Sequence, residues 1–213
     1  MDYQEGISMS IWNRLPARNR RLVSAAVVLL LLAGGAVLAW GLSEHREDKF
    51  RPYAVQRGLL YRSRQLGKDD FSGLKRRNIT QVVNLRSESE DPQAYATEAG
   101  ACQAQGMRMV HIPIVEALPD DGQIVRFLRA VNDNQGATLV HCAQGRSRTG
   151  FMVAAFRVVM DAWPARQAYD EMVQDGYEPS DANGKNERFE ILERLGRQRA
   201  EWLGQINTKT TQP

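Results

Sequence analysis

Residues 141–150 read His-Cys-Ala-Gln-Gly-Arg-Ser-Arg-Thr-Gly, and this stretch decides the fold of the chain. The four residues before it, 137–140, form a short, apolar and partly β-branched run that is typical of a buried strand. Residues 151–160 form a longer run that is apolar apart from Arg157, which predicts a buried helix. The sequence therefore predicts that residues 141–150 make the turn between a strand and a helix.

The predicted turn has the properties of an anion-binding loop. Backbone N–H groups at a helix start lack partners within the helix, and the helix dipole adds partial positive charge there. Gly145 and Gly150 allow the main chain to curl tightly and to approach an anion closely. We therefore predict that a phosphate group binds here. The loop residues expected to hold it are Ala143, Gln144, Gly145, Arg146, Ser147 and Arg148.

Four side chains of this stretch carry its predicted chemistry. Cys142, at a helix start beside a guanidinium, is expected to be a thiolate nucleophile. Arg148 can present a planar, two-pronged donor to two oxygens of a phosphoryl group. Thr149 places a hydroxyl where it can hydrogen-bond the thiolate or help it leave, and His141 is expected to brace the loop rather than to act as a base.

The stretch matches the pattern His-Cys-x-x-Gly-x-x-Arg-Thr-Gly, and on this motif the chain resembles the cysteine-dependent phosphatases. The resemblance is to the compact dual-specificity and atypical tyrosine phosphatases found in bacteria, fungi and plants. It runs over roughly residues 53–200 and includes Leu-Tyr-Arg-Ser at 60–63, Val-Val-Asn-Leu-Arg at 82–86 and His-Ile-Pro-Ile at 111–114.

The resemblance implies a reaction and a substrate class. Cys142 would attack phosphorus in line, the loop amides and Arg148 would hold the equatorial oxygens, and water would later hydrolyse the cysteinyl phosphate. This chemistry needs no metal, and no cofactor is expected. Phosphotyrosine in a protein is the leading substrate because it is the commonest in the family, and dual specificity is possible.

Two alternatives to a protein phosphatase stay open. Gly-Arg-Ser-Arg at 145–148 also resembles the loop of phosphatases that act on phosphatidylglycerophosphate, so a phospholipid headgroup is a second substrate class. Ala143 argues mildly against a phosphoinositide, since relatives directed to such lipids tend to carry two loop bases. The non-enzyme alternative is a phosphate-binding sensor without turnover, and the presence of Cys142 and Arg148 argues against it.

The proton donor for the leaving group is open among three carboxylates. Relatives use an aspartate on a loop before the helix that precedes the cysteine, but residues 115–123 read Val-Glu-Ala-Leu-Pro-Asp-Asp-Gly-Gln and contain no Trp-Pro-Asp. Asp120 also fits a helix N-cap, with Gln123 three residues later. Asp121 would then be freer to reach the site. We favour Asp121, then Asp120, with Glu116 third.

Residues 22–42 carry no charge over twenty-one residues, a length of about 30 Å in a helix, and are predicted to be a transmembrane anchor. Four arginines precede this segment, so residues 1–21 are expected to be a basic cytoplasmic N-terminus. The catalytic domain would then lie on the periplasmic side of a bacterial inner membrane. A cleaved signal peptide, with a site near Val-Leu-Ala at 37–39, is the competing interpretation.

The rest of the chain predicts an α/β fold with a mostly parallel central sheet flanked by helices. We expect a linker at 43–52, a phosphatase domain at 53–204 and a disordered tail at 205–213. Within the domain the sequence predicts a pair of short strands around Gly58, further strands at 79–85, 108–114 and 137–140, and helices at 71–77, 94–105, 121–131, 151–160, from 163–164 onward and at 186–203.

Composition sets the remaining bounds. The hydrophobic content of 43% is enough for one core of about 150 residues. The formal charge of +3 is small and its basic residues are scattered, so nucleic acid is not an expected partner. Cys102 and Cys142 are not expected to form a disulfide, because the bond would consume the nucleophile.

Overall fold

The structure, a computed structural model, describes residues 52–115, 118–179 and 187–208, together with residues 16, 27, 28, 30 and 31. The chain divides into two units, residues 1–49 and 50–213. In the first unit, residues 27, 28, 30 and 31 are helical and exposed.

The predicted basic N-terminus, the anchor at 22–42 and the linker at 43–52 otherwise lie outside the described residues. Among the residues that the structure does describe, no helix has the length and apolarity needed to cross a bilayer.

The second unit is built on a central sheet whose described strands run in the order β1-β2-β5-β3-β4. The strands are β1 (Tyr53–Gln56), β2 (Leu60–Ser63), β3 (Ile79–Asn84), β4 (Arg108–His111) and β5 (Ala137–His141). The pairs β2–β5, β5–β3 and β3–β4 are parallel, as the sequence predicts for most of the sheet.

The edge strand β1 makes the sheet mixed rather than wholly parallel. It runs antiparallel to β2, and the turn between them contains Gly58 with φ +78°. A short connection of this kind can only join antiparallel neighbours, whereas parallel strands need a long crossover. The two short strands predicted around Gly58 are therefore confirmed, and they are the reason for the mixed sheet.

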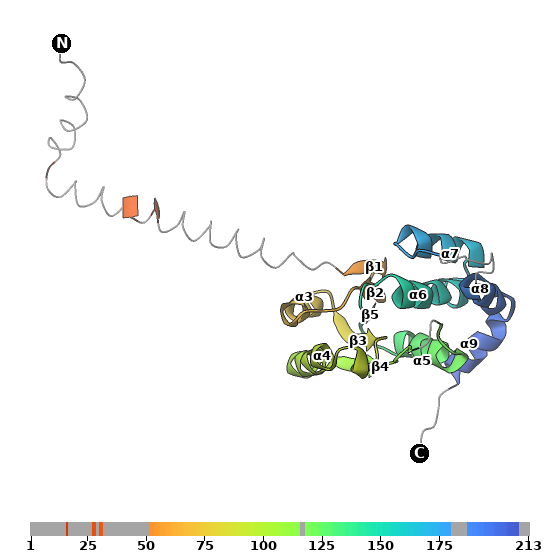
Figure 1. The fold of residues 1–213 in the computed structure, drawn as a ribbon. Coiled ribbons are helices and arrows are strands. Elements are labelled where there is room, and N and C mark those ends of the chain that lie inside the picture. The colour runs from red at the N-terminus through yellow and green to blue at the C-terminus, as the bar shows by residue number, and fades with distance from the viewer. Residues whose placement is uncertain are drawn as a thin grey trace, which may run out of the picture. The chain divides into compact units, whose positions relative to one another are not determined.

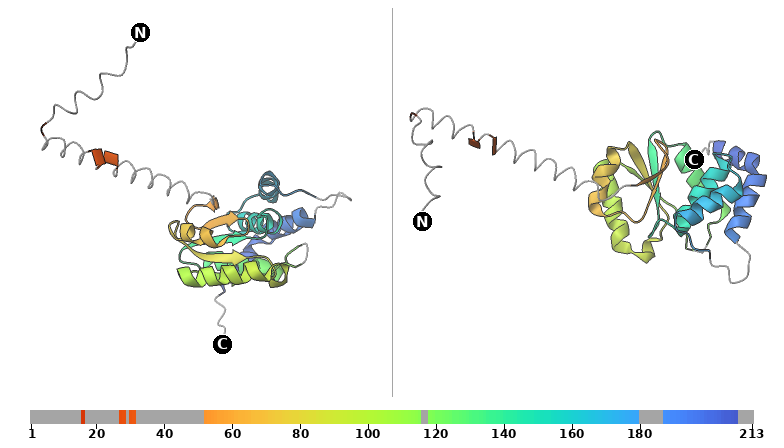
Figure 2. Two further views of the ribbon diagram at one scale, coloured as in Figure 1. Left: turned by 60° about the vertical axis from the view of Figure 1, so that its left-hand side comes forward. Right: turned by 90° about the horizontal axis from the view of Figure 1, so that it is seen from above.

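Helices cover both faces of the sheet and form three layers (Figure 1). One face packs against α3 (Phe71–Lys75) and α4 (Pro92–Gln105), and the other packs against the remaining helices. These are α5 (Asp121–Asn132), α6 (Ser147–Val159), α7 (Ala165–Gln174), α8 (Glu187–Arg197) and α9 (Arg199–Asn207). The view from above in Figure 2 shows the sheet edge-on between the two layers of helices.

The alternation of side chains along the strands explains the two cores. Val82 and Leu139 face α3 and α4, whereas their neighbours Val83 and Val140 face the larger helical layer. Successive residues of a strand point to opposite faces, so a strand covered on both sides is apolar at consecutive positions. All five residues of β5 are buried, which places its carboxyl end in the middle of the molecule.

The C-terminal region differs from its prediction. Residues 186–203 were expected to form one helix, but the described part holds α8 and α9, with a break at Gln198. Arg199, just after the break, donates from Nε to the carbonyl oxygen of Val159 at the end of α6, at 2.8 Å. Helix α9 also extends to Asn207 because Ile206 is buried, so the predicted tail starts too early.

Candidate active site

The predicted loop joins the carboxyl end of β5 to the start of α6. At that edge His141 is paired in register with Ser63 of β2 on one side and with Asn84 of β3 on the other. Helix α6 begins at Ser147, so it includes the last four residues of the stretch that the sequence predicts as a turn. Ligands of open α/β folds bind at such carboxyl edges, and the loop lies there.

Gly145 is required by the shape of the loop. Its φ of +73° is in the left-handed region, and a Cβ there would lie 2.5 Å from the carbonyl oxygen of Ser63. A side chain would thus be strained by the backbone and would also clash with β2. The glycine lets the loop turn tightly against the neighbouring strand.

Residues of β2 and the segment after it hold the loop from outside. The amide of Gln65 donates to the carbonyl oxygen of Ala143 at 3.0 Å, and Arg62 Nη2 donates to that of Gly145 at 2.6 Å. The Arg62 guanidinium is nearly fully buried and is also paired with Asp175 at the end of α7. The shape of the loop is therefore fixed by neighbouring elements as well as by its own sequence.

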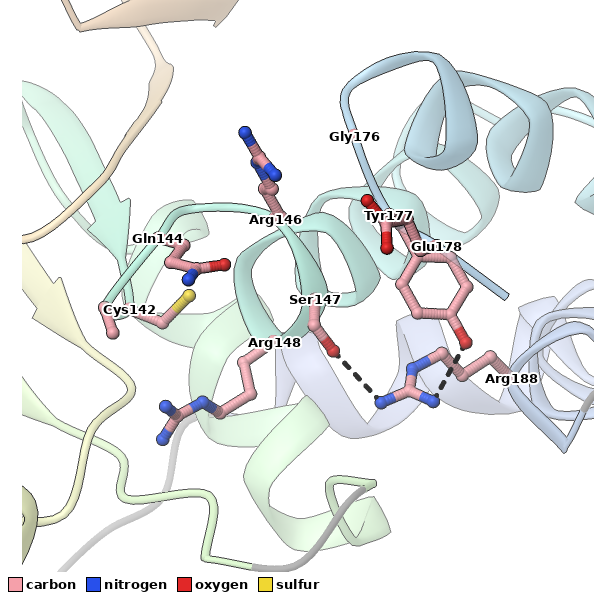
Figure 3. Close-up of a pocket in the computed structure, with 10 residues that line it drawn as sticks. Cys142, Gln144, Arg146, Ser147, Arg148, Gly176, Tyr177, Glu178 and Arg188 are labelled. Carbon is pink, nitrogen blue, oxygen red and sulfur yellow. Dashed lines mark hydrogen bonds between the residues drawn. The ribbon is translucent and has the colours of Figure 1, made fainter. Parts of the chain in front are cut away.

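A pocket of about 620 Å³ opens over the loop (Figure 3). Its floor is formed by the loop, from Cys142 to Arg148, and its wall comes from the segment after α7 and from the start of α8. The residues that line it are Cys142, Ala143, Gln144, Arg146, Ser147, Arg148, Gly176, Tyr177, Glu178 and Arg188. The predicted nucleophile, all the predicted phosphate-binding residues except Gly145, and an unpredicted wall thus share one cavity.

Arg188 joins this wall to the loop. Its Nη2 donates to the Ser147 hydroxyl and its Nη1 donates to the Tyr177 hydroxyl, each at 3.1 Å (Figure 3). The guanidinium carbon also lies 4.9 Å from the centroid of the Tyr177 ring, within the range of a cation–π contact. The sequence analysis missed Arg188 because it lies about forty residues beyond the motif, in a helix with an ordinary amphipathic pattern.

Arg148 is held by Glu90, which the sequence analysis also missed. Nη1 and Nη2 of Arg148 donate to Oε1 and Oε2 of Glu90 at 2.5 and 3.0 Å, and Nη1 lies 3.3 Å from the carbonyl oxygen of Ile114. Glu90 ends a short 3₁₀ helix, η2 (Glu88–Glu90). The hydrogen bond from Arg148 is the largest cause that lowers the pKa of Glu90 to about 2.

Glu90 belongs to a second cavity beside the first. This cavity has a volume of about 580 Å³ and shares Ser147, Arg148 and Arg188 with the first pocket. Its other lining residues are Ser87, Ser89, Glu90, Ile114 and Val115. The Val115 side chain is 76% exposed and offers an apolar contact next to the phosphate-binding arginine.

His141 lies beneath the loop. Its ring is completely buried, with Nε2 at 2.9 Å from Oε1 of Glu98 and Nδ1 at 3.3 Å from the carbonyl oxygen of Cys142. This is the position that a brace for the loop requires. The Thr149 hydroxyl is also buried, and among the described residues it has no hydrogen-bond partner, Cys142 included.

Asp120 and Asp121, two of the carboxylates considered for the proton donor, are not among the described residues that line the two pockets. Asp120 is the N-cap of α5 and accepts from the Gln123 amide at 2.7 Å, as the capping pattern predicts. Asp121 makes a bidentate pair with Arg194 of α8, at 2.6 and 2.8 Å. Hydrogen bonding to Arg194 lowers the pKa of Asp121, and Glu116 lies outside the described residues.

The two cysteines are both free thiols, with different surroundings. Burial, followed by the charge of Glu98, raises the pKa of Cys102 to about 12, so this thiol is a poor nucleophile. Cys142 lines the pocket. Within the ranges that the structure describes, no group of three or more histidine, cysteine or acidic side chains is placed to hold a metal ion.

With this geometry established, comparison with known proteins gives the family. A family model described as "DSP-PTPase phosphatase fused to NAD+ Kinase" matches residues 40–189. This range includes the described strands, the loop from Cys142 to Arg148 and the pocket residues Tyr177 and Arg188. The chain belongs to this DSP-PTPase family. It is therefore a cysteine-dependent phosphatase of the protein tyrosine and dual-specificity type.

Individual relatives agree with the family. The dual specificity protein phosphatase TpbA of Pseudomonas aeruginosa strain UCBPP-PA14 is 27% identical over 179 residues, which cover 79% of this chain and 78% of TpbA. The crystal structure of P. aeruginosa TpbA superposes with a TM-score of 0.54 at 22% identity, over 68% of this chain and 86% of that one. Tk-PTP in its active form gives 0.55 at 22% identity, over 67% and 94%. The two superpositions show a shared fold.

Proposed function

We propose that this DSP-PTPase hydrolyses phosphotyrosine in proteins, and with lower preference phosphoserine or phosphothreonine, through a cysteinyl phosphate on Cys142. The observation that carries the proposal is the pocket in which Cys142, the loop and Arg148 converge. The name of TpbA, a dual specificity protein phosphatase, supports a protein substrate. The Tyr177 ring and the Arg188 guanidinium on the pocket wall suit a flat aromatic leaving group.

The reaction follows from the positions of these groups. The Cys142 thiolate attacks phosphorus, the bond from phosphorus to the leaving phenolic oxygen breaks, and that oxygen takes a proton from a carboxylic acid. Loop amides and Arg148 hold the equatorial oxygens as charge spreads over them. Water then attacks the cysteinyl phosphate and releases inorganic phosphate, which restores the thiolate.

For the proton donor, Asp121 remains our first candidate, followed by Asp120 and Glu116. Asp121 is the first residue of α5. Relatives carry their acid on the loop just before this helix. In the observed conformation it is paired with Arg194, so this pair has to open before Asp121 can bring a proton to the leaving group. Asp120 would likewise have to leave its helix-capping position.

We also propose that residues 22–42 anchor the phosphatase in the inner membrane, with the catalytic domain in the periplasm. The uncharged length of this segment and the four arginines before it support the proposal. Protease treatment of spheroplasts tests it. Digestion of the catalytic domain in intact spheroplasts is expected, whereas protection until lysis, or release of a shortened chain into the medium, would contradict it.

A substrate-trapping experiment tests the protein-phosphatase proposal. The full-length Cys142→Ser protein, which keeps Arg148 and the loop, is incubated with detergent-solubilised membranes, and the bound material is identified. We expect a tyrosine-phosphorylated protein that orthovanadate displaces. A trapped phospholipid instead would favour the headgroup alternative.

Turnover by the wild-type protein decides between an enzyme and a sensor. Wild-type protein is expected to hydrolyse p-nitrophenyl phosphate and to be inhibited by orthovanadate. Binding of phosphopeptides without any turnover would identify a sensor and contradict the proposal.

A further inference from the structure

Glu98 on α4 is a buried carboxylate under the phosphate-binding loop. It is 1% exposed and makes hydrogen bonds with three side chains. These are Gln65 Nε2 at 2.8 Å, His141 Nε2 at 2.9 Å and Asn84 Nδ2 at 3.2 Å. A buried carboxyl group is costly unless it is paired and hydrogen-bonded, and here three polar side chains converge on it. Both oxygens of Glu98 therefore have partners, Oε1 with His141 and Oε2 with Gln65 and Asn84.

Glu98 reaches the nucleophile through His141. The His141 imidazole is hydrogen-bonded at Nε2 to Oε1 of Glu98, at 2.9 Å, and at Nδ1 to the carbonyl oxygen of Cys142, at 3.3 Å. The carbonyl oxygen of His141 itself accepts from the Leu85 amide at 3.0 Å. Hydrogen bonds therefore hold the main chain on both sides of the His141–Cys142 peptide. One of them comes from the His141 ring, which Glu98 orients.

The same carboxylate reaches the phosphate-binding arginine through Gln65. The Gln65 amide nitrogen donates to Glu98, and its amide oxygen accepts from Arg86 Nη1 at 2.8 Å. Arg86 pairs in turn with Glu90 at 3.5 Å, and Glu90 holds both terminal nitrogens of Arg148. The polar chain thus runs in the order His141, Glu98, Gln65, Arg86, Glu90 and Arg148.

We propose that Glu98 is a positioning residue for the phosphatase reaction, at the branch of a hydrogen-bond chain that links the nucleophile to the phosphate-binding arginine. It lines neither pocket and does not touch substrate. Its role is to keep Cys142 and Arg148 in one fixed relation, so that the phosphoryl group meets both at once. This inference rests on the reaction proposed above, in which Cys142 attacks and Arg148 holds the oxygens.

The Glu98→Gln substitution keeps nearly the same side-chain shape but changes the hydrogen bonds that the side chain can make. The amide has one acceptor oxygen, which can replace the Oε2 atom that now accepts from Gln65 and Asn84. The NH₂ group then faces His141 Nε2 in place of Oε1, so the link to His141 either breaks or requires the tautomer that accepts at Nε2. Because small displacements of reacting groups reduce rates strongly, the effect should fall on the chemical step.

The test measures kcat and KM of full-length Glu98→Gln with p-nitrophenyl phosphate. We expect kcat to fall by about 10- to 100-fold while KM changes less than about threefold. Gln81→Met is the matched control, since Gln81 is equally buried and hydrogen-bonded, to Ala130 and Thr138, but lies outside the chain. Its kcat should stay within about twofold of wild type even if its melting temperature falls.

Alkylation gives a second readout that does not need turnover. In a Cys102→Ala background Cys142 is the single cysteine, since the sequence has two. Iodoacetamide should then modify Cys142 at least about threefold more slowly when Glu98→Gln is added, because the loop around the thiolate is no longer fixed. If the wild-type chain proved to have no turnover, the proposed function would fail, while this rate would still test the role of Glu98.

Gln65→Met keeps the inference testable if Glu98→Gln does not fold, because Gln65 is only partly buried. It should lower kcat about tenfold alone, and in the Glu98→Gln background it should add less than about twofold, since both break one chain. Fully additive effects on kcat, or a folded Glu98→Gln protein with wild-type kcat and alkylation rate, would overturn the proposal.

Discussion

Two carboxylate–guanidinium pairs of the same bidentate form serve different regions of this phosphatase. Glu90 and Arg148 meet beside the pocket, with side chains 31% and 21% exposed. Asp121 and Arg194 join the start of α5 to the last turn of α8 on the surface, with side chains 57% and 37% exposed. In both pairs the arginine lowers the pKa of the carboxyl group.

The difference lies in what else each arginine has to do. In the proposed reaction Arg148 also holds a phosphoryl group, so Glu90 would orient a catalytic side chain. Arg194 has no role in the pocket, so its pair with Asp121 ties two helices together and competes with the proposed use of Asp121 as an acid. Substitutions in the two pairs should therefore separate catalytic effects from effects on stability.

The largest effect is expected from Arg148→Lys. A lysine cannot offer two parallel N–H groups to a phosphoryl group or to Glu90, so kcat/KM for p-nitrophenyl phosphate should fall by about 10³-fold. Steady-state kinetics and orthovanadate titration measure the loss. Arg166→Lys, an exposed arginine on α7, is the control and should retain wild-type kinetics. Full retention of activity by Arg148→Lys would refute the proposed role of the two parallel N–H groups of Arg148.

The next effect concerns the proton donor and depends on the leaving group. If Asp121 is the acid, Asp121→Asn should lower kcat by about 10²-fold or more for an alkyl phosphate but far less for p-nitrophenyl phosphate. Asp120→Asn and Glu116→Gln are measured in parallel, with the same pair of substrates. An equal loss of kcat for both substrates would show that the substituted carboxylate is not the proton donor. Its contribution to the structure would then explain the loss.

Glu90→Gln should have a smaller effect on catalysis. The neutral amide accepts from Arg148 at one oxygen only, so the guanidinium is held less firmly and kcat/KM should fall by about tenfold. Glu88→Gln, in the same turn but outside both pockets, should be unchanged. A rise in kcat/KM for Glu90→Gln would show instead that Glu90 competes with substrate for Arg148.

The pair of Glu90 and Arg148 also predicts that the stability of the fold depends on pH. The pKa of Glu90 is lowered from 4.5 to about 2, so the pair stabilises the fold above about pH 4.5 and loses this contribution as the pH falls toward 2. The difference in unfolding free energy between wild type and Glu90→Gln should shrink over this range. Urea unfolding at several pH values measures it, and a constant difference would contradict the assignment.

The smallest effect is expected from the surface pair. Arg194→Met should cost about 1 kcal/mol or less, because both partners are well exposed and screened. Arg197→Met, three residues later on α8 in a longer and more exposed pair, should cost less still. Without Arg194 the Asp121 carboxyl should titrate at higher pH, which NMR can follow. A loss of several kcal/mol would show that the α5–α8 contact matters more than its exposure indicates.

Much of the site could be predicted because its predicted residues lie close together in the sequence, within one motif. The residues from His141 to Gly150 indicate a strand end, a tight turn and a helix start, although contacts from Arg62 and Gln65 also hold the turn in place. The pair of strands around Gly58 follows from one glycine in the same way. Local turn chemistry thus indicated the position of the loop, whereas the alternation of strands and helices indicated the fold class.

The groups that were missed act from far away in the sequence. Glu98 lies 43 residues from His141, and Glu90 lies 58 residues from Arg148. Both sit in stretches whose composition is ordinary for an exposed turn or helix, so no pattern distinguishes a buried partner from a surface residue. The break between α8 and α9 depends likewise on the tertiary hydrogen bond from Arg199 to Val159.

The central claim is that Cys142 carries the phosphoryl group during turnover. Rapid acid quench of the full-length enzyme with p-nitrophenyl phosphate, followed by peptide mass spectrometry, tests it most directly. The account predicts one phosphoryl group on the peptide that contains Cys142, and neither this adduct nor turnover in Cys142→Ser. Phosphate on a different residue, or turnover retained by Cys142→Ser, would contradict it.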